Sequence, residues 1–233
     1  MKKVKWNPTS LLASEVLSPP LPARKYQPDW YKKMSAFVEG RPNYRTDGTV
    51  DKTLKHCIPF RDSVDAGYIM ESWQEINFEF SDDGSFSYVY PTEPAIVSNR
   101  DHVSMDMGDE YHPIEFVLHP QWQPELPSGW SMLYTQPLNR PELPFFFPSG
   151  IVDADKFVST DSKSSLPFYV KKSFTGTLPI GTPLVQMIPL KRESWLGSGE
   201  TFDAKKQTAT SFEVHKQFWG GYKKFAWSKK SYK

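Results

Sequence analysis

The sequence predicts a mainly β protein, and three observations support that fold class. Short runs of aromatic and β-branched residues are separated by Gly, Pro, Asp and Asn, which is typical of strands joined by turns. The chain also has 21 prolines, and because proline is confined to the edges, bulges and loops of sheets, this number favours many short strands. Third, one stretch alternates apolar and polar residues. The predicted strands are YIMESW, EINFEF, SFSYVY, IEFVLH, WSMLYT, PFYVKK and PLVQMI.

The alternating stretch predicts a β-hairpin over residues 75–90. Ile76, Phe78 and Phe80 alternate with polar residues, as expected for a strand with one buried face. Asp83 and Gly84 follow, and this pair readily adopts the positive φ angles of a tight turn. The second strand then runs through SFSYVY.

Length and composition favour a single domain over residues 1–233. Apolar residues make up 38% of the chain and charged residues 24%, enough for both a packed core and a solvated surface. The 28 basic and 27 acidic residues nearly cancel, so we do not expect nucleic acid as a partner. With one cysteine, Cys57, and no run of about 18 apolar residues, we expect a cytoplasmic protein without a membrane span.

Both ends of the chain differ from the middle. Residues 1–27 predict a Pro-rich extended arm, because closely spaced prolines fix φ and remove backbone donors. The stretch 28–40 predicts a short helix that begins at Pro28 and Asp29. Residues 199–233 predict a partly helical extension with a basic tail, in which charge favours a solvated, flexible chain over a partner contact. The residues that could share one helical face there are Phe212, His215, Phe218 and Trp219, before Gly220-Gly221.

Four segments, in order, resemble the motifs of the dUTPase and dCTP deaminase superfamily. Ala66-Gly67-Tyr68-Ile69 is similar to its first strand, and WSMLYTQPLNR resembles the strand that leads into its phosphate-binding Pro-Arg-Ser-Gly. Residues 150–155, Gly-Ile-Val-Asp-Ala-Asp, resemble its Gly-Val-Ile-Asp-x-Asp hairpin. Residues 181–188, Gly-Thr-Pro-Leu-Val-Gln-Met-Ile, resemble its Gly-Asp-Arg-Ile-Ala-Gln-Leu strand.

The resemblance implies a β-clip core over residues 58–190, with short helices and extensions at both ends. An immunoglobulin-like sandwich or a jelly roll would also fit short alternating strands. The segment 57–62, Cys-Ile-Pro-Phe-Arg-Asp, is in addition similar to one found in uncharacterised phage and bacterial proteins. That similarity names no activity.

The same resemblance assigns roles to individual residues. It implies that Asp153 is the carboxylate that activates the attacking water, and that Arg140 and Asn139 lie where the family binds phosphate. Several departures weaken the hydrolytic reading: the serine of Pro-Arg-Ser-Gly and the Asp of the first motif are absent. Asp153 could instead cap its own turn. Further ligand-binding candidates are Gln186, which could equally be a buried strand residue bonded to backbone, Tyr68 and Trp219.

A second group of polar residues lies in the stretch SNRDHVSMDMGDEYHP. His102, Asp106 and His112 could contribute to a divalent metal site, but their spacing matches no established ligand pattern. We therefore predict no metal site, and expect Mg²⁺ only as the companion of a bound nucleotide.

Three functions follow from these observations. The leading hypothesis is a β-clip protein that binds a nucleotide-like ligand or a protein partner and has lost the standard hydrolytic site. One alternative is an active nucleotide pyrophosphatase or deaminase relative. The other is a structural or virion-associated assembly protein, with the two ends of the chain as straps between subunits. The resemblance implies a homo-oligomer, with a trimer as the expected form.

Overall fold

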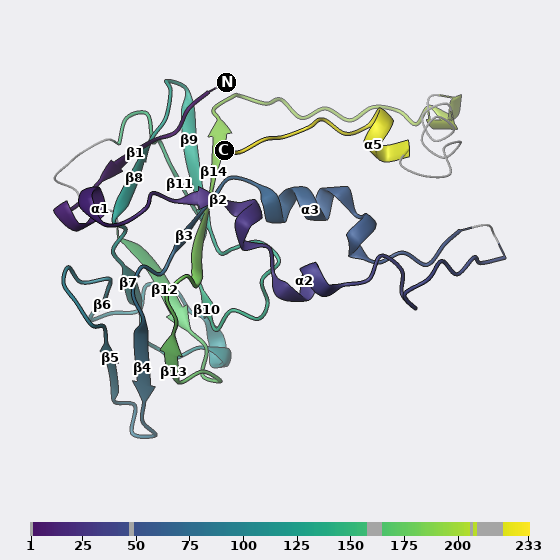
Figure 1. Cartoon of the computed structure of the whole chain (residues 1–233). Coiled ribbons are helices and arrows are strands. Elements are labelled where there is room, and N and C mark those ends of the chain that lie inside the picture. Colours follow the sequence, from purple (N-terminus) through teal and green to yellow (C-terminus); the bar gives the residue numbers. More distant parts are fainter. Residues whose placement is uncertain (1, 47–48, 158–164, 206, 209–220) are drawn as a thin grey trace. The chain divides into compact units, whose positions relative to one another are not determined.

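The computed structural model describes residues 2–46, 49–157, 165–205, 207–208 and 221–233. It confirms a mainly β protein with several antiparallel sheets and a few short helices (Figure 1). The chain divides into two compact units. The sheet unit comprises Met1–Lys33, Ser63–Arg192 and Tyr232–Lys233, and the extension unit comprises Met34–Asp62 and Glu193–Ser231.

The largest sheet of the sheet unit has five strands in the order β11-β9-β14-β3-β2, and every neighbouring pair is antiparallel. Strand β14 lies between two partners, and its first five residues are buried. This explains why its sequence is mostly apolar rather than alternating, with Gln186 the polar residue among the buried ones. The strands are β2 (Leu21–Pro22), β3 (Tyr68–Glu71), β9 (Trp130–Thr135), β11 (Gly150–Val152) and β14 (Pro183–Lys191).

Gly67 allows β3 to begin close against β14. Its φ is +70°, and a Cβ atom at this position would lie 2.0 Å from the carbonyl oxygen of Met187. Only glycine fits here, because both the backbone conformation and the space exclude a side chain.

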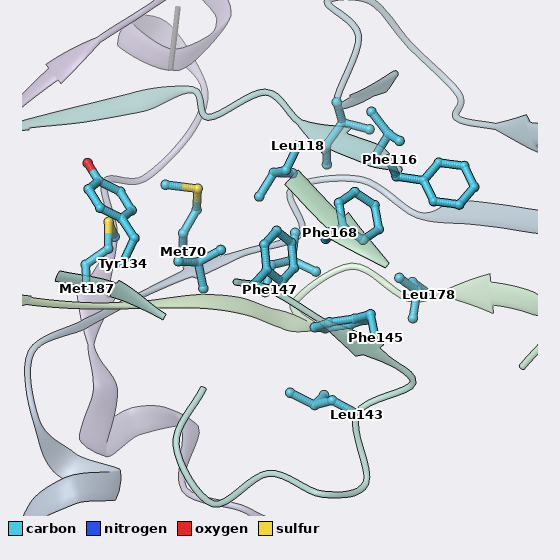
Figure 2. Packing of buried hydrophobic residues seen from close by; sticks show 14 of the residues in the cluster. Met70, Phe116, Leu118, Tyr134, Leu143, Phe145, Phe147, Phe168, Leu178 and Met187 are labelled. Carbon is cyan, nitrogen blue, oxygen red and sulfur yellow. The ribbon is translucent and has the colours of Figure 1, made fainter. Parts of the chain in front are cut away.

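A four-stranded sheet in the order β10-β12-β7-β6 carries the aromatic core. Phe116 is fully buried, and its ring centroid lies 5.1 Å from that of Phe78 and 5.5 Å from that of Phe168. Figure 2 shows Phe116, Phe168 and Phe147 together in this cluster, with Tyr134 and Met187 at its other end. The strands are β6 (Val97–Asn99), β7 (Phe116–Leu118), β10 (Phe145–Phe146) and β12 (Leu166–Val170).

The predicted hairpin is confirmed as part of a three-stranded sheet in the order β13-β4-β5. Ile76 and Phe78 are buried, and Phe80 pairs with Phe86 across the turn. Gly84 has a φ of +85°, as the turn requires. The strands are β4 (Ile76–Phe80), β5 (Phe86–Val89) and β13 (Gly176–Leu178).

The N-terminal arm lies on its own chain and is more regular than predicted. Strand β1 (Lys5–Pro8) pairs with β8 (Trp122–Glu125), and helix α1 (Leu11–Glu15) follows. The Ser10 hydroxyl accepts a hydrogen bond from the Ala13 N–H at 3.1 Å and so caps the N-terminus of α1. The prediction of an extended arm rested on the prolines and missed this helix. Residues 16–20 are irregular, as the prolines predict, before β2 joins the main sheet.

The helix predicted over residues 28–40 begins as expected but is shorter. Helix α2 (Asp29–Lys33) has Asp29 in its first turn and ends at Lys33. Helix α3 (Ile58–Asp65) was not predicted, although Pro59 in its first turn is a usual helix start. The remaining short helices are η1 (Ala23–Tyr26), η2 (Leu54–His56), η3 (Gly108–Glu110) and α5 (Gly221–Phe225).

Most of the described C-terminal residues 221–233 are exposed, as expected for a solvated tail, but some of them make specific hydrogen bonds. In the extension unit, Asp62 accepts hydrogen bonds from the Trp227 indole and the Lys230 ammonium, each at 2.7 Å. In the sheet unit, the carbonyl of Lys233 accepts a hydrogen bond from the Tyr68 hydroxyl at 3.3 Å. The predicted helical face at 212–219 lies outside the described residues, and α5 begins at Gly221.

Candidate functional site

The four segments that resemble dUTPase motifs belong to one sheet. The first segment overlaps β3, the second β9, the third β11 and the fourth β14, and these strands are consecutive neighbours in the order β11-β9-β14-β3. The sheet therefore joins parts of the chain that are up to about 120 residues apart, as the pairing of Ile69 with Gln186 shows.

Gln186 is a buried residue that ties three segments together. Its side-chain oxygen accepts from the Leu138 N–H at 2.8 Å, and its side-chain nitrogen donates to the carbonyls of Ser63 at 2.9 Å and Ala66 at 2.7 Å. The residue is 1% exposed. All three partners are backbone groups, so Gln186 holds these chain segments together and offers no free edge to a ligand.

Tyr68 is likewise part of the packed interior. It is 9% exposed, and its ring makes edge contacts with Trp6 and Tyr232, at centroid distances of 5.4 and 6.1 Å. Burial raises the pKa of its hydroxyl, which therefore stays protonated and donates to the Lys233 carbonyl. Trp219, the remaining aromatic candidate, lies outside the described residues.

Asp153 follows β11 and is held by two side chains. Its carboxylate accepts from the Ser131 hydroxyl at 2.7 Å and lies 3.0 Å from the Arg192 guanidinium, while 48% of the side chain is exposed. The Ser131 hydrogen bond and the Arg192 charge lower the pKa of Asp153. A carboxylate stabilised in this way is a weaker base, which disfavours it as the group that activates water.

Arg192 also donates hydrogen bonds to both carboxylate oxygens of Asp155, one from each terminal nitrogen of its guanidinium. The Arg192 hydrogen bonds, supported by the Gly129 N–H, lower the pKa of Asp155 to about 2. This bidentate pair joins the end of β14 to the turn after β11, so the two aspartates and Arg192 act together as a structural clamp.

Arg140 and Asp153 lie at opposite ends of β9. Asp153 is bonded to Ser131, near the start of the strand, whereas Arg140 follows Thr135, at its end. Four residues of strand span about 13 Å. Within one chain, the structure therefore does not bring the predicted phosphate-binding and catalytic residues together.

The Arg140 guanidinium is held by two neighbours. It donates to the backbone carbonyl of Tyr26 at 2.8 Å and to the carboxylate of Glu142. The adjacent Asn139 adopts a positive φ of 59° and donates to the Ser63 hydroxyl at 2.8 Å. Asparagine tolerates this backbone conformation well, which gives Asn139 a structural reason to be here.

A surface depression of about 520 Å³ opens beside Arg140. It presents three basic side chains, two carboxylates and two aromatic rings. The Trp30 indole donates to Glu142 at 3.3 Å, and Lys32 forms an ion pair with Asp29 at 3.3 Å, so both carboxylates already have partners. The lining residues are Lys25, Tyr26, Gln27, Asp29, Trp30, Lys32, Arg140, Glu142, Gly181 and Pro183.

The metal candidates are not gathered in one place. Asp106 accepts from the Gly108 N–H at 2.9 Å in a local turn, and His112 stacks on Phe80 with the ring centroids 3.6 Å apart. His102 is exposed. Among the described residues, no group of three or more His, Cys, Asp or Glu side chains could hold a metal ion.

Glu115 is a buried charge that no motif in the sequence predicted. It is fully buried and accepts from Arg100 at 2.5 Å, from the Ser104 N–H at 2.7 Å and from the Tyr169 hydroxyl at 2.8 Å. Burial alone would raise the pKa of Glu115, but the bonds from Ser104 and Tyr169 and the Arg100 charge lower it to about 2. The only signal was a Glu inside the apolar run IEFVLH.

Comparison with known proteins adds no family. No family model matches the chain, and a search of curated proteins finds no relative. In the described part of the chain, none of the helices has the length and apolar character needed to cross a membrane.

Proposed function

We propose that the protein binds a nucleotide-like ligand in the depression beside Arg140 and does not use the standard dUTPase hydrolytic site. The observation that carries this proposal is the composition of the depression. It combines the arginine that the resemblance assigned to phosphate with two lysines and two aromatic rings. We assign the main sheet to a β-clip core on the same grounds, since the four resembling segments are neighbours in it.

The charges of the depression suit an anion. Lys25, Lys32 and Arg140 outnumber Asp29 and Glu142 by one, three minus two. A phosphate group would accept charge-assisted hydrogen bonds from these cations, which are about twice as strong as neutral ones. Because it would compete with Glu142 for Arg140, we expect modest affinity that falls with ionic strength.

The aromatic residues suit the other half of such a ligand. Trp30 and Tyr26 both line the depression, and Trp30 is only partly buried. A flat base gains area burial and stacking energy on rings of this kind. The position of Asp153 at the far end of β9 supports binding without hydrolysis.

Thermal unfolding with nucleoside mono-, di- and triphosphates, with and without Mg²⁺, tests this function. A ligand that binds only the folded state raises the Tm, so at least one nucleotide should do so. Arg140→Ala should abolish the ligand-induced shift, whereas Asp153→Asn should leave it unchanged. The shift is compared within each variant, since Arg140 also bonds to Tyr26 and its loss alters the Tm itself.

Two results would overturn the proposal. If no nucleotide in the panel raised the Tm, the hypothesis of nucleotide binding would be rejected. A shift that is lost in Asp153→Asn but kept in Arg140→Ala would place the ligand at the other end of β9. That result would favour the alternative hypothesis of an active nucleotide pyrophosphatase or deaminase relative.

A second candidate function, self-assembly, rests on the segment 193–203 of the extension unit. Trp195, Leu196 and Phe202 are 86%, 96% and 78% exposed on a stretch without helix or strand. Large apolar side chains exposed within one short segment favour burial in an interface. We propose that the segment binds a second copy of the chain, which supports the expected homo-oligomer.

The oligomeric mass tests this second function. Light scattering across a range of concentrations should give a multiple of the mass of one chain, with three copies the form implied by the resemblance. Trp195→Ser combined with Leu196→Ser should lower that mass to one chain. Leu11→Ser, which removes an exposed leucine from α1, serves as the control. A single-chain mass for the unaltered protein would reject self-assembly.

A further inference from the structure

We propose that a second cavity, which residues 16–21 and the strand β3 help to line, binds a small organic ammonium ion. The cavity has a volume of about 180 Å³ and lies within the sheet unit. It is separate in chemistry from the depression beside Arg140, because its lining is mostly apolar. The residues that carry the inference are Glu71, Trp73, Trp122, Tyr26 and Ile180.

The walls of the cavity are fixed in place. On the N-terminal side of the segment 16–21, the Thr9 N–H donates to the Gln121 carbonyl at 2.9 Å, and the Ser10 hydroxyl donates to the Gln121 side chain at 2.7 Å. At the C-terminal end of this segment, Leu21 pairs with Ile69 of β3. The segment 16–21 is thus anchored at both ends, so the cavity exists without a ligand, as is usual for small-molecule sites.

Glu71 is the only Asp, Glu, Lys or Arg in the lining, all of which lies in the described part of the chain. One carboxylate oxygen accepts from the Tyr26 hydroxyl at 2.7 Å. An ionised carboxylate has room for about four hydrogen bonds, so it can accept further donors. Pro19, Pro20 and Pro120 also line the cavity, and prolines contribute no backbone N–H donor. The cavity therefore places one carboxylate in a mostly apolar lining, which suits a cation.

Two tryptophans strengthen the preference for a cation. Trp73 and Trp122 both line the cavity, and their indole nitrogens are buried without a hydrogen-bond partner within the described residues. Because these nitrogens are buried, a ligand in the cavity would not accept hydrogen bonds from them. Aromatic ring faces attract ammonium ions, and tryptophan does so best.

The size of the cavity suits a ligand with about one ring. A cavity of about 150 Å³ lined by apolar residues is known to hold benzene, and the present volume is similar. An amine with a single aromatic ring would place its body against the apolar walls and its ammonium group near Glu71. An anion of the same size would be repelled by Glu71.

Three probes of matched size and different charge test the proposal: benzylammonium, benzyl alcohol and benzoate. Calorimetric titration at neutral pH should show binding of benzylammonium, affinity for benzyl alcohol weaker by about tenfold or more, and no binding of benzoate. Equal affinity for all three, preference for benzoate, or binding of none would overturn the proposal on the unaltered protein alone.

Variants then assign the charge to Glu71. Glu71→Gln keeps the shape and can still accept from Tyr26, so it should reduce the affinity for benzylammonium to that for benzyl alcohol. Glu75→Gln, the same change at an exposed position outside the cavity, should have no effect. Unchanged benzylammonium binding in a folded Glu71→Gln would refute the assignment.

A third variant separates this site from the nucleotide site. Arg140→Ala should retain benzylammonium binding, because Arg140 does not line this cavity. Ile180→Trp, at the exposed rim, should block benzylammonium by filling space and so tests the location even if Glu71→Gln does not fold. Normal binding in Ile180→Trp would place the ligand elsewhere.

Discussion

The Tyr26 hydroxyl donates a 2.7 Å hydrogen bond to the carboxylate of Glu71, while the Tyr26 carbonyl accepts one from Arg140. Tyr26 thus contributes to both the depression beside Arg140 and the cavity that contains Glu71. Burial, and then the neighbouring Glu71, raise the pKa of the Tyr26 hydroxyl. The hydroxyl therefore remains a donor throughout the neutral range.

Tyr26→Phe should lower the free energy of unfolding by about 1.5 kcal/mol, because it removes a hydrogen bond to a charged group. Urea denaturation followed by tryptophan fluorescence measures this change. Tyr222→Phe, at an exposed tyrosine of α5, should change stability by less than about 0.5 kcal/mol. Equal effects of the two variants would show that the Tyr26 bond contributes nothing.

Gly67→Ala should destabilise the protein by more than about 3 kcal/mol, since the new methyl group would collide with the Met187 carbonyl. Gly84→Ala is the matched control. Gly84 also has a positive φ, of +85°, but a Cβ atom there would meet nothing within 4 Å. It should lose only about 1 kcal/mol, from backbone strain. Similar midpoints of thermal unfolding for the two variants would contradict the close approach of β3 and β14.

Gln186→Leu should lower stability by about 3 kcal/mol, because three backbone groups lose their partner in the interior. Leucine has a similar volume, so the loss reports hydrogen bonding more than packing. Chemical denaturation of this variant is compared with that of Gln207→Leu, at an exposed position where little change is expected. A loss below about 0.5 kcal/mol would mean that Gln186 is not a structural tie.

Glu115 should make stability depend on pH in the acid range. Its pKa is about 2 in the folded protein against an ordinary value of 4.5, so its contribution is complete above 4.5 and is lost as the pH falls toward 2. Glu115→Gln should cost about 2–4 kcal/mol at pH 7, because Arg100 loses its buried partner. The difference between the variant and the unaltered protein should shrink in urea titrations at pH 3.

The control for this prediction is Glu75→Gln, which removes an exposed carboxylate. It should leave the acid dependence unchanged. A difference between Glu115→Gln and the unaltered protein that stays constant from pH 7 to pH 3 would show that protonation of Glu115 is not linked to unfolding.

The sequence by itself determined the local features. Alternating Ile76 and Phe78, with Asp83-Gly84 after them, encode a hairpin because side-chain periodicity and turn geometry are properties of neighbouring residues. The start of α2 at Asp29 follows from the same kind of local signal. So does the mainly β class, which short runs and frequent prolines determine together.

Only the tertiary structure decided which distant residues meet. The sequence placed Asp153 and Arg140 in one implied site, but β9 separates them, because strand length rather than motif order sets their distance. Gln186 is buried and bonded to the backbone of Ser63, and Glu115 is buried and bonded to Tyr169. In both pairs the partner lies far away in the chain. The cavity at Glu71 likewise exists only because residues 16–21 fold back against β3, a contact that no local pattern encodes.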